Sequence, residues 1–227
     1  MSSKVRNSDS LPFLIGASVL TILIWFIPLA RMIVYPFRLF VTFIHEGGHT
    51  LAALLTQGSV VRLVIYSDAS GETYTLGGMP LIIASAGYLA STAYGAGLLL
   101  LCCDGRKAKS VLTITAAFIL VLTGLYAGNH FSWLTGIGLT IFLMLFAIAA
   151  SPRAAHFFLS FLAVQCCLNA MFDLRTLFLI SATTNMRSDA ATMQDLTLIP
   201  SVFWAALWLG ISVIALLYAL RSHTVQR

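Results

Sequence analysis

Charged residues are scarce in this sequence. Only 9% of the 227 residues are Asp, Glu, Lys or Arg, whereas 59% are hydrophobic, and the mean hydropathy is +0.93. Soluble domains carry about 25% charged residues, so this composition excludes that class. The apolar runs are long enough to cross a hydrocarbon core of about 30 Å, which takes roughly 20 helical residues. The sequence therefore predicts a polytopic membrane protein.

Cysteine is also scarce, and its placement excludes a disulfide framework. The 4 cysteines form adjacent pairs, Cys102–Cys103 and Cys166–Cys167, in or at the edge of apolar runs. Sequence neighbours do not easily share one tetrahedral metal, so we interpret them as small buried hydrophobic residues. Internal repeats, low-complexity tracts and linkers are missing too, which favours a single membrane-embedded domain over residues 1–227.

The apolar runs predict an all-α polytopic membrane protein with about six to seven transmembrane helices, the lower number applying if one run is re-entrant. The predicted spans are about 12–29, 32–56, 80–103, 110–127, 131–150, 156–180 and 201–220. The first run is longer than the core of a signal peptide and lacks a small-residue cleavage pattern. We therefore expect it to remain as an anchor.

The net charge of +5 comes largely from basic residues between the predicted spans. The segment DGRKAK after the third span, Arg153 before the sixth and Arg221 and Arg227 in the tail fall on one side if the spans alternate. The positive-inside rule makes that side cytoplasmic, so the charge does not imply a nucleic-acid partner. The orientation of the first two segments stays open.

Two stretches depart from the helical pattern. Residues 58–78, GSVVRLVIYSDASGETYTLGG, place β-branched and aromatic residues on both sides of the turn-forming SDASG, which predicts a β-hairpin. Residues 181–200 form a polar segment that contains Ser188, Asp189 and Asp195. We interpret this segment as a loop that acts as a lid or a connector.

His45, Glu46 and His49 form the pattern H-E-x-x-H on the second predicted span, within FIHEGGHTLAALL. A helix turns by about 100° per residue, so His49 lies only roughly 40° around from His45 and both imidazoles project from one face. That geometry suits two ligands of one zinc ion, with Glu46 as general base toward a metal-activated water. A carboxylate at membrane depth costs about 2.5–3.5 kcal/mol, and a bound dication offsets this cost. A polar helix–helix contact or a degenerate site is the competing interpretation.

A catalytic zinc site needs a third protein ligand, and depth in the membrane favours Asp173. His49 and Asp173 lie about equally far into spans that run in the same direction if the spans alternate. Asn169 lies one helical turn before Asp173, where its amide can polarise a scissile carbonyl or hold substrate backbone. Pairing with Arg175 or capping of a broken helix are the alternatives for Asp173. Asp189 is the next candidate ligand, although a role as a loop cap fits it better.

The chain resembles the site-2-protease-like intramembrane metalloproteases, in particular their short bacterial and plant-type branch. Four blocks within about residues 40–210 carry the resemblance: HEGGHTLAALLTQGSVVRLVIYSDASGETY, SAGYLASTAYGAG, NAMFDL and RSDAATM. The resemblance implies that His45, His49 and Asp173 bind Zn²⁺. It also implies that Glu46 activates water and that the segment 58–78 offers an edge strand to an unwinding substrate.

Together these features predict a zinc metallopeptidase that hydrolyses a peptide bond in or near a transmembrane segment of a membrane-protein substrate. We expect it in a lipid bilayer, as a multi-pass protein of the bacterial inner membrane. The main alternative is a catalytically inactive metal-binding membrane scaffold or chaperone. A metal or ion transporter is a second alternative, because ionisable residues at mid-membrane also line permeation paths. A transporter would spread polar residues over several spans, whereas here they concentrate on two.

Overall fold

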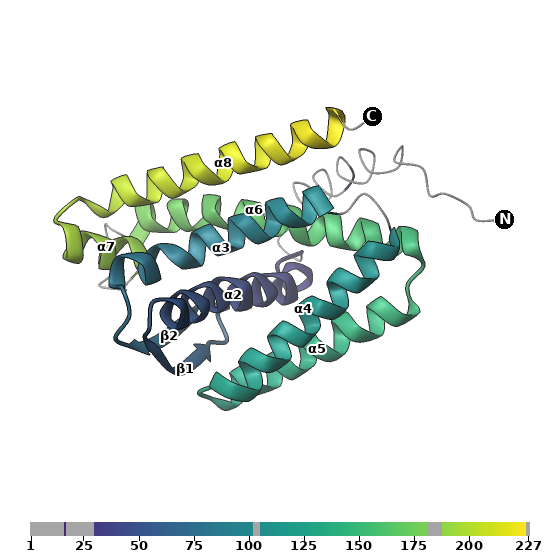
Figure 1. Cartoon of the computed structure of the whole chain (residues 1–227), viewed down its shortest axis with the longest axis horizontal. Coiled ribbons are helices and arrows are strands. Elements are labelled where there is room, and N and C mark those ends of the chain that lie inside the picture. The colour runs from purple at the N-terminus through teal and green to yellow at the C-terminus, as the bar shows by residue number, and fades with distance from the viewer. Residues whose placement is uncertain (1–15, 17–29, 102–104, 181–187, 226–227) are drawn as a thin grey trace.

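The computed structural model describes residue 16 and residues 30–101, 105–180 and 188–225, and for 167–180 it describes the backbone but not the side chains. The predicted span 12–29 therefore lies almost entirely outside the described residues. The elements, drawn in Figure 1, are α2 (Ala30–Leu55), β1 (Ser59–Ile65), β2 (Gly71–Leu76), α3 (Pro80–Leu101), α4 (Gly105–Tyr126), α5 (His130–Ala149), α6 (Pro152–Ile180), α7 (Asp189–Thr197) and α8 (Ser201–Val225).

The prediction of a helical membrane protein with a short β-hairpin is confirmed. Four described helices are long and apolar enough to cross a membrane: Pro80–Leu100, Lys107–Tyr126, His130–Ala149 and Ser201–Ala219. Large apolar side chains such as Leu134 and Ile148 are 73% and 72% exposed on the outer faces of these helices, as a lipid-facing surface requires. The chain is thus an integral membrane protein.

The segment 181–200 is not simply the polar loop that the sequence predicts, because its second half contains the short helix α7. The hydroxyl of Ser188 caps this helix by accepting a hydrogen bond from the backbone N–H of Ala191 at 3.2 Å. Leu198 ends the helix in a left-handed conformation, and Pro200 follows. The sequence therefore contains signals for both ends of this helix, a Ser cap at its start and a Pro shortly after its end. The segment lacks the apolar pattern by which helices are predicted elsewhere in the chain.

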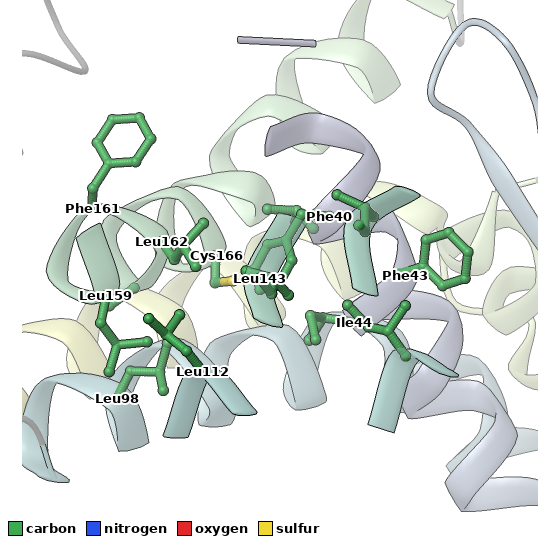
Figure 2. Packing of buried hydrophobic residues seen from close by; sticks show 14 of the residues in the cluster. Phe40, Phe43, Ile44, Leu98, Leu112, Leu143, Leu159, Phe161, Leu162 and Cys166 are labelled. Atoms are coloured by element: carbon green, nitrogen blue, oxygen red, sulfur yellow. The ribbon is translucent and has the colours of Figure 1, made fainter. Parts of the chain in front are cut away.

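Helix α2 lies in the interior of the fold, in contact with α3, α4, α5, α6 and both strands. One large core surrounds its apolar side, where Phe40, Phe43 and Ile44 meet Leu143 of α5 and Leu162 of α6. Figure 2 shows members of this core from different helices, with Phe40 and Leu143 close together near its centre. The helix that carries H-E-x-x-H is therefore held by its neighbours over most of its length.

The hairpin is antiparallel and lies alongside α2. Its turn is fastened to that helix, since the hydroxyl of Tyr35 donates to the carbonyl of Ser67 at 2.6 Å and the hydroxyl of Thr42 donates to the carbonyl of Ala69 at 2.7 Å. The outer edge of β1 contacts the connection between α4 and α5, where the N–H of Gly128 donates to the carbonyl of Leu63 at 2.8 Å. The sheet has two strands in the described chain, so the outer edge of β2 has no strand beside it.

Close packing of α2 against α3 depends on Gly48. A Cβ at this position would lie 2.6 Å from both the carbonyl oxygen of Ala86 and the Cβ of Ala90. The first of these atoms belongs to the backbone and cannot rotate away. The two helix backbones therefore approach as closely as they do only because position 48 has no side chain.

We predict that Gly48→Ala lowers the thermal stability of the detergent-solubilised protein by the equivalent of about 1–3 kcal/mol, the usual cost of overpacking a tight site. Gly124→Ala on α4 is the matched control, because no atom lies within 4 Å of its added Cβ. Thermal unfolding followed by circular dichroism measures both. Equal melting temperatures for the two variants would contradict this account of the α2–α3 contact.

Candidate metal centre

The H-E-x-x-H residues lie where α2 faces α3 and the hairpin. One possible ligand atom from each of His45, Glu46 and His49 lies within 4.8 Å of the other two. The two imidazole rings are 4.8 Å apart at their centroids and meet edge to face. One helical turn therefore brings together two nitrogen donors and a carboxylate, as the spacing predicts.

The orientation of His49 is fixed by the first turn of α3. Its Nδ1 lies 2.6 Å from the backbone carbonyl oxygen of Ile83. A carbonyl oxygen only accepts, so Nδ1 carries a proton and donates it to Ile83. In the neutral ring Nε2 then presents a lone pair, which is the arrangement of a metal-binding histidine with an outer hydrogen-bond partner.

His45 is oriented mainly by aromatic contact. Its ring meets the ring of Tyr88 edge to face at 4.8 Å, and Tyr88 in turn stacks on Trp208 of α8 at 4.8 Å. The Nδ1 atom of His45 is buried and has no hydrogen-bond partner among the described residues. The two imidazoles therefore differ at Nδ1, which is hydrogen-bonded to a backbone carbonyl in His49 and has no such partner among the described residues in His45.

Asp189, the first residue of α7, reaches both imidazoles. Its Oδ2 atom lies 3.0 Å from Nε2 of His45 and 3.2 Å from Nε2 of His49. Burial raises the pKa of the Asp189 carboxyl, but the charge of His49 and hydrogen bonds with both rings lower it more, so this pKa lies below its usual range. The interpretation of Asp189 as a loop cap is wrong, because the capping group of α7 is the neighbouring Ser188.

Gly87 of α3 forms the floor of the site. A Cβ built on it would collide with Nε2 of His45 and would lie 2.5 Å from Nε2 of His49. A side chain at position 87 would therefore occupy the place next to both donor nitrogens. The glycine leaves that place to groups that the two nitrogens can bind.

Glu46 is held by the hairpin. The hydroxyl of Thr73 on β2 donates to Oε2 of Glu46 at 2.7 Å, and Glu46 is only 3% exposed. Gly71 also lies against this side chain, because a Cβ there would be 2.8 Å from Oε1 of Glu46. One carboxylate oxygen is thus occupied by Thr73, and a strand passes directly over the other.

The predicted ligand Asp173 and the predicted polar residue Asn169 lie on α6, within the stretch whose side chains are not described. Their roles stay predictions. The site also includes residues that the sequence analysis did not assign to it, namely Thr73, Ile83, Gly87 and Tyr88. Of these, Gly87 was the easiest to find, since it is the one glycine in the run PLIIASAGYLAS.

The family model described as Peptidase M50B-like matches residues 15–219, which is most of the chain. The chain belongs to this metallopeptidase family. The family assignment confirms the resemblance to site-2-protease-like proteins and, with the apolar helices, supports a membrane-embedded metallopeptidase. Searches of curated proteins and of solved structures give no match.

The residues of this M50B-like protein fit a metal ion on structural grounds as well. The Nε2 atoms of His45 and His49 both face Oδ2 of Asp189, and Gly87 adds no side chain beside them. Two imidazoles and a carboxylate form a common protein ligand set of catalytic zinc. The donor groups at this site therefore suit a metal ion.

We predict that Gly87→Ala lowers the zinc affinity of the purified protein by about 10–100-fold, the usual effect of disturbing the surroundings of metal ligands. The added methyl group would occupy the space in front of the imidazoles. Gly97→Ala, on the same helix and with no atom within 4 Å of the new Cβ, should bind zinc as the wild type does. Competition with a fluorescent chelator measures the affinity. Unchanged affinity in Gly87→Ala would place the ion elsewhere.

Proposed function

We propose that the protein is a zinc-dependent intramembrane endopeptidase that cleaves a peptide bond in or near a transmembrane segment of another membrane protein. The observation that carries this proposal is the convergence of His45, Glu46 and His49 within 4.8 Å, beside strand β2, whose outer edge has no neighbouring strand among the described residues. Membership of a metallopeptidase family supports it. The bacterial inner membrane remains the predicted location.

His45 and His49 are proposed to hold the metal, together with a carboxylate. When bound, a zinc ion polarises the scissile carbonyl and lowers the pKa of water at the site. The choice of zinc rests on the ligand set, because imidazole and carboxylate groups together suit tetrahedral zinc better than magnesium or calcium, which prefer oxygen ligands.

Glu46 is proposed to act as the general base. It takes a proton from the attacking water and afterwards delivers it to the leaving amine. Thr73 is proposed as a positioning residue, because its hydrogen bond at 2.7 Å to Oε2 fixes the orientation of the Glu46 carboxylate. Asn169 remains a predicted contact to the substrate backbone.

The open edge of β2 is proposed to hold the substrate. A peptide bond within a helix is shielded by helical hydrogen bonds, so cleavage in a membrane requires an unwound stretch. Backbone groups of that stretch are satisfied if it adds as a strand to β2. Thr73 on the same strand contacts Glu46, so a segment bound along β2 lies beside the proposed base.

We predict that Glu46→Gln keeps bound zinc but lowers cleavage of a co-expressed single-span substrate by about 10²–10⁴-fold, the range that general acid–base groups supply. The amide has nearly the shape of the carboxylate but cannot accept the proton. Metal content is measured by mass spectrometry of the purified protein, and cleavage by immunoblot.

The control for this variant is the wild-type protein treated with a chelator and then reloaded with zinc, which should lose and regain activity. Wild-type cleavage by Glu46→Gln would exclude Glu46 as the base. Zinc-loaded wild-type protein without any chelator-sensitive proteolysis would instead favour the metal-binding scaffold.

A further inference from the structure

We propose that Asp189 of α7 is the third protein ligand of the metal. This inference rests on the metal site of the proposed function and adds to it the identity of the carboxylate. A single oxygen, Oδ2, lies 3.0 Å from Nε2 of His45 and 3.2 Å from Nε2 of His49. The three side chains are partly or fully buried, with exposed fractions between 8% and 23%.

These distances match those between donors that share one metal. Ligand atoms about 2.0–2.1 Å from a zinc ion and arranged as a tetrahedron lie roughly 3.3–3.4 Å from one another. The observed separations of 3.0 and 3.2 Å are shorter by only a few tenths of an ångström. A small outward movement of the three side chains is enough to admit the ion.

The orientation of the two imidazoles agrees with this assignment. Nδ1 of His49 faces the carbonyl oxygen of Ile83 at 2.6 Å, which turns Nε2 of the same ring toward Oδ2 of Asp189. Nε2 of His45 faces the same carboxylate oxygen. A metal ion bound at this point contacts all three side chains at once.

The position of Asp189 is fixed by the packing of α7 between α3 and α8. Ala190 and Met193 are fully or almost fully buried, in one cluster with Tyr88 and Trp208. This is the same Tyr88 ring that packs against His45. The helix that carries the third donor and the ring that orients the first are therefore parts of one cluster.

Two polar contacts fasten the other end of α7 to α8. The indole N–H of Trp204 donates to the hydroxyl of Thr197 at 3.1 Å, and the N–H of Ser201 donates to the side-chain oxygen of Gln194 at 2.8 Å. Helix α7 is thus anchored independently of the metal. A ligand on a short anchored helix is preorganised, which lowers the entropic cost of binding the ion.

The test measures zinc in the purified full-length protein. Asp189→Asn should lower the zinc affinity at least 10-fold, whereas Asp173→Asn and Asp195→Asn should keep it. Asp195 is the matched control because it lies on α7 and its side chain is exposed. Zinc retained in Asp189→Asn would overturn the assignment, whereas a wild-type protein that binds no zinc would overturn the proposed metal site itself.

A spectroscopic measurement separates direct ligation from an indirect effect. In a background in which the 4 native cysteines are replaced, Asp189→Cys loaded with cobalt(II) should show a thiolate-to-cobalt charge-transfer band. Asp195→Cys should show none. Absence of the band from a cobalt-loaded Asp189→Cys protein would overturn the assignment even if Asp189→Asn binds zinc poorly.

A second, independent observation concerns which side of the membrane lies nearer to the metal centre. Basic residues gather at one end of the bundle, the end at which α4 and α6 begin and α8 finishes: Lys107, Lys109, Arg153 and Arg221. The ammonium group of Lys109 donates to the carbonyl of Ile148 near the end of α5 at 3.2 Å, which confirms that these helix ends are together. The positive-inside rule makes this end cytoplasmic.

The metal centre lies toward the opposite end. His49 precedes the end of α2 at Leu55 by a distance of about 9 Å, at 1.5 Å per residue. Helix α7 connects α6 to α8 at this same end, and Figure 1 shows the hairpin on that side as well. We infer that the metal centre lies nearer the non-cytoplasmic face and acts on the part of a substrate segment nearest that face.

Cysteine accessibility tests this orientation without any need for activity. In the cysteine-free background, Leu198→Cys, at a position 89% exposed after α7, should react with a membrane-impermeant maleimide in intact spheroplasts. Ser151→Cys, exposed between α5 and α6 at the basic end, should react only after the membrane is permeabilised. The reverse pattern would place the metal centre at the cytoplasmic face.

Discussion

The close approach of α2 and α3 is the constraint on which the site depends. Gly48 lets the two backbones meet, and Gly87 then leaves room in front of the imidazoles on α2. The carbonyl of Ile83, in the first turn of α3, accepts a hydrogen bond from Nδ1 of His49 and so fixes the orientation of that ring. The position of both histidines, the space beside them and the ring orientation of His49 are therefore all consequences of one helix–helix contact.

The parts of the site supplied by other segments are arranged around that contact from opposite sides. The hairpin brings Thr73 to Glu46, and α7 brings Asp189 to the two histidines. Each segment is anchored elsewhere, the hairpin by the turn contacts of Tyr35 and the helix by its cluster with Trp208. The proposed base and the proposed third ligand are thus supported separately, and one can be disturbed without the other.

The local features of the molecule were predictable from the sequence. His45, Glu46 and His49 share one helical face because of their spacing alone, and the hairpin follows from β-branched residues around a turn motif. The position of Asp189 beside the two histidines was not predictable in this way. Depth along straight spans favours Asp173, and a segment that returns as a short packed helix cannot be recognised from depth alone. Thr73 could not be found either, because its role arises only from how the hairpin lies against α2.

The exposed apolar faces of the outer helices affect which positions of the sequence tolerate substitution during evolution. A side chain such as Leu134, which faces lipid, is constrained to be apolar but not to have a particular shape, since fluid acyl chains adapt to any contour. Positions around Gly48 and Gly87 have no such freedom, because fixed atoms surround them. Substitutions are therefore expected to accumulate on the lipid-facing surface, while the contact between α2 and α3 retains its small residues.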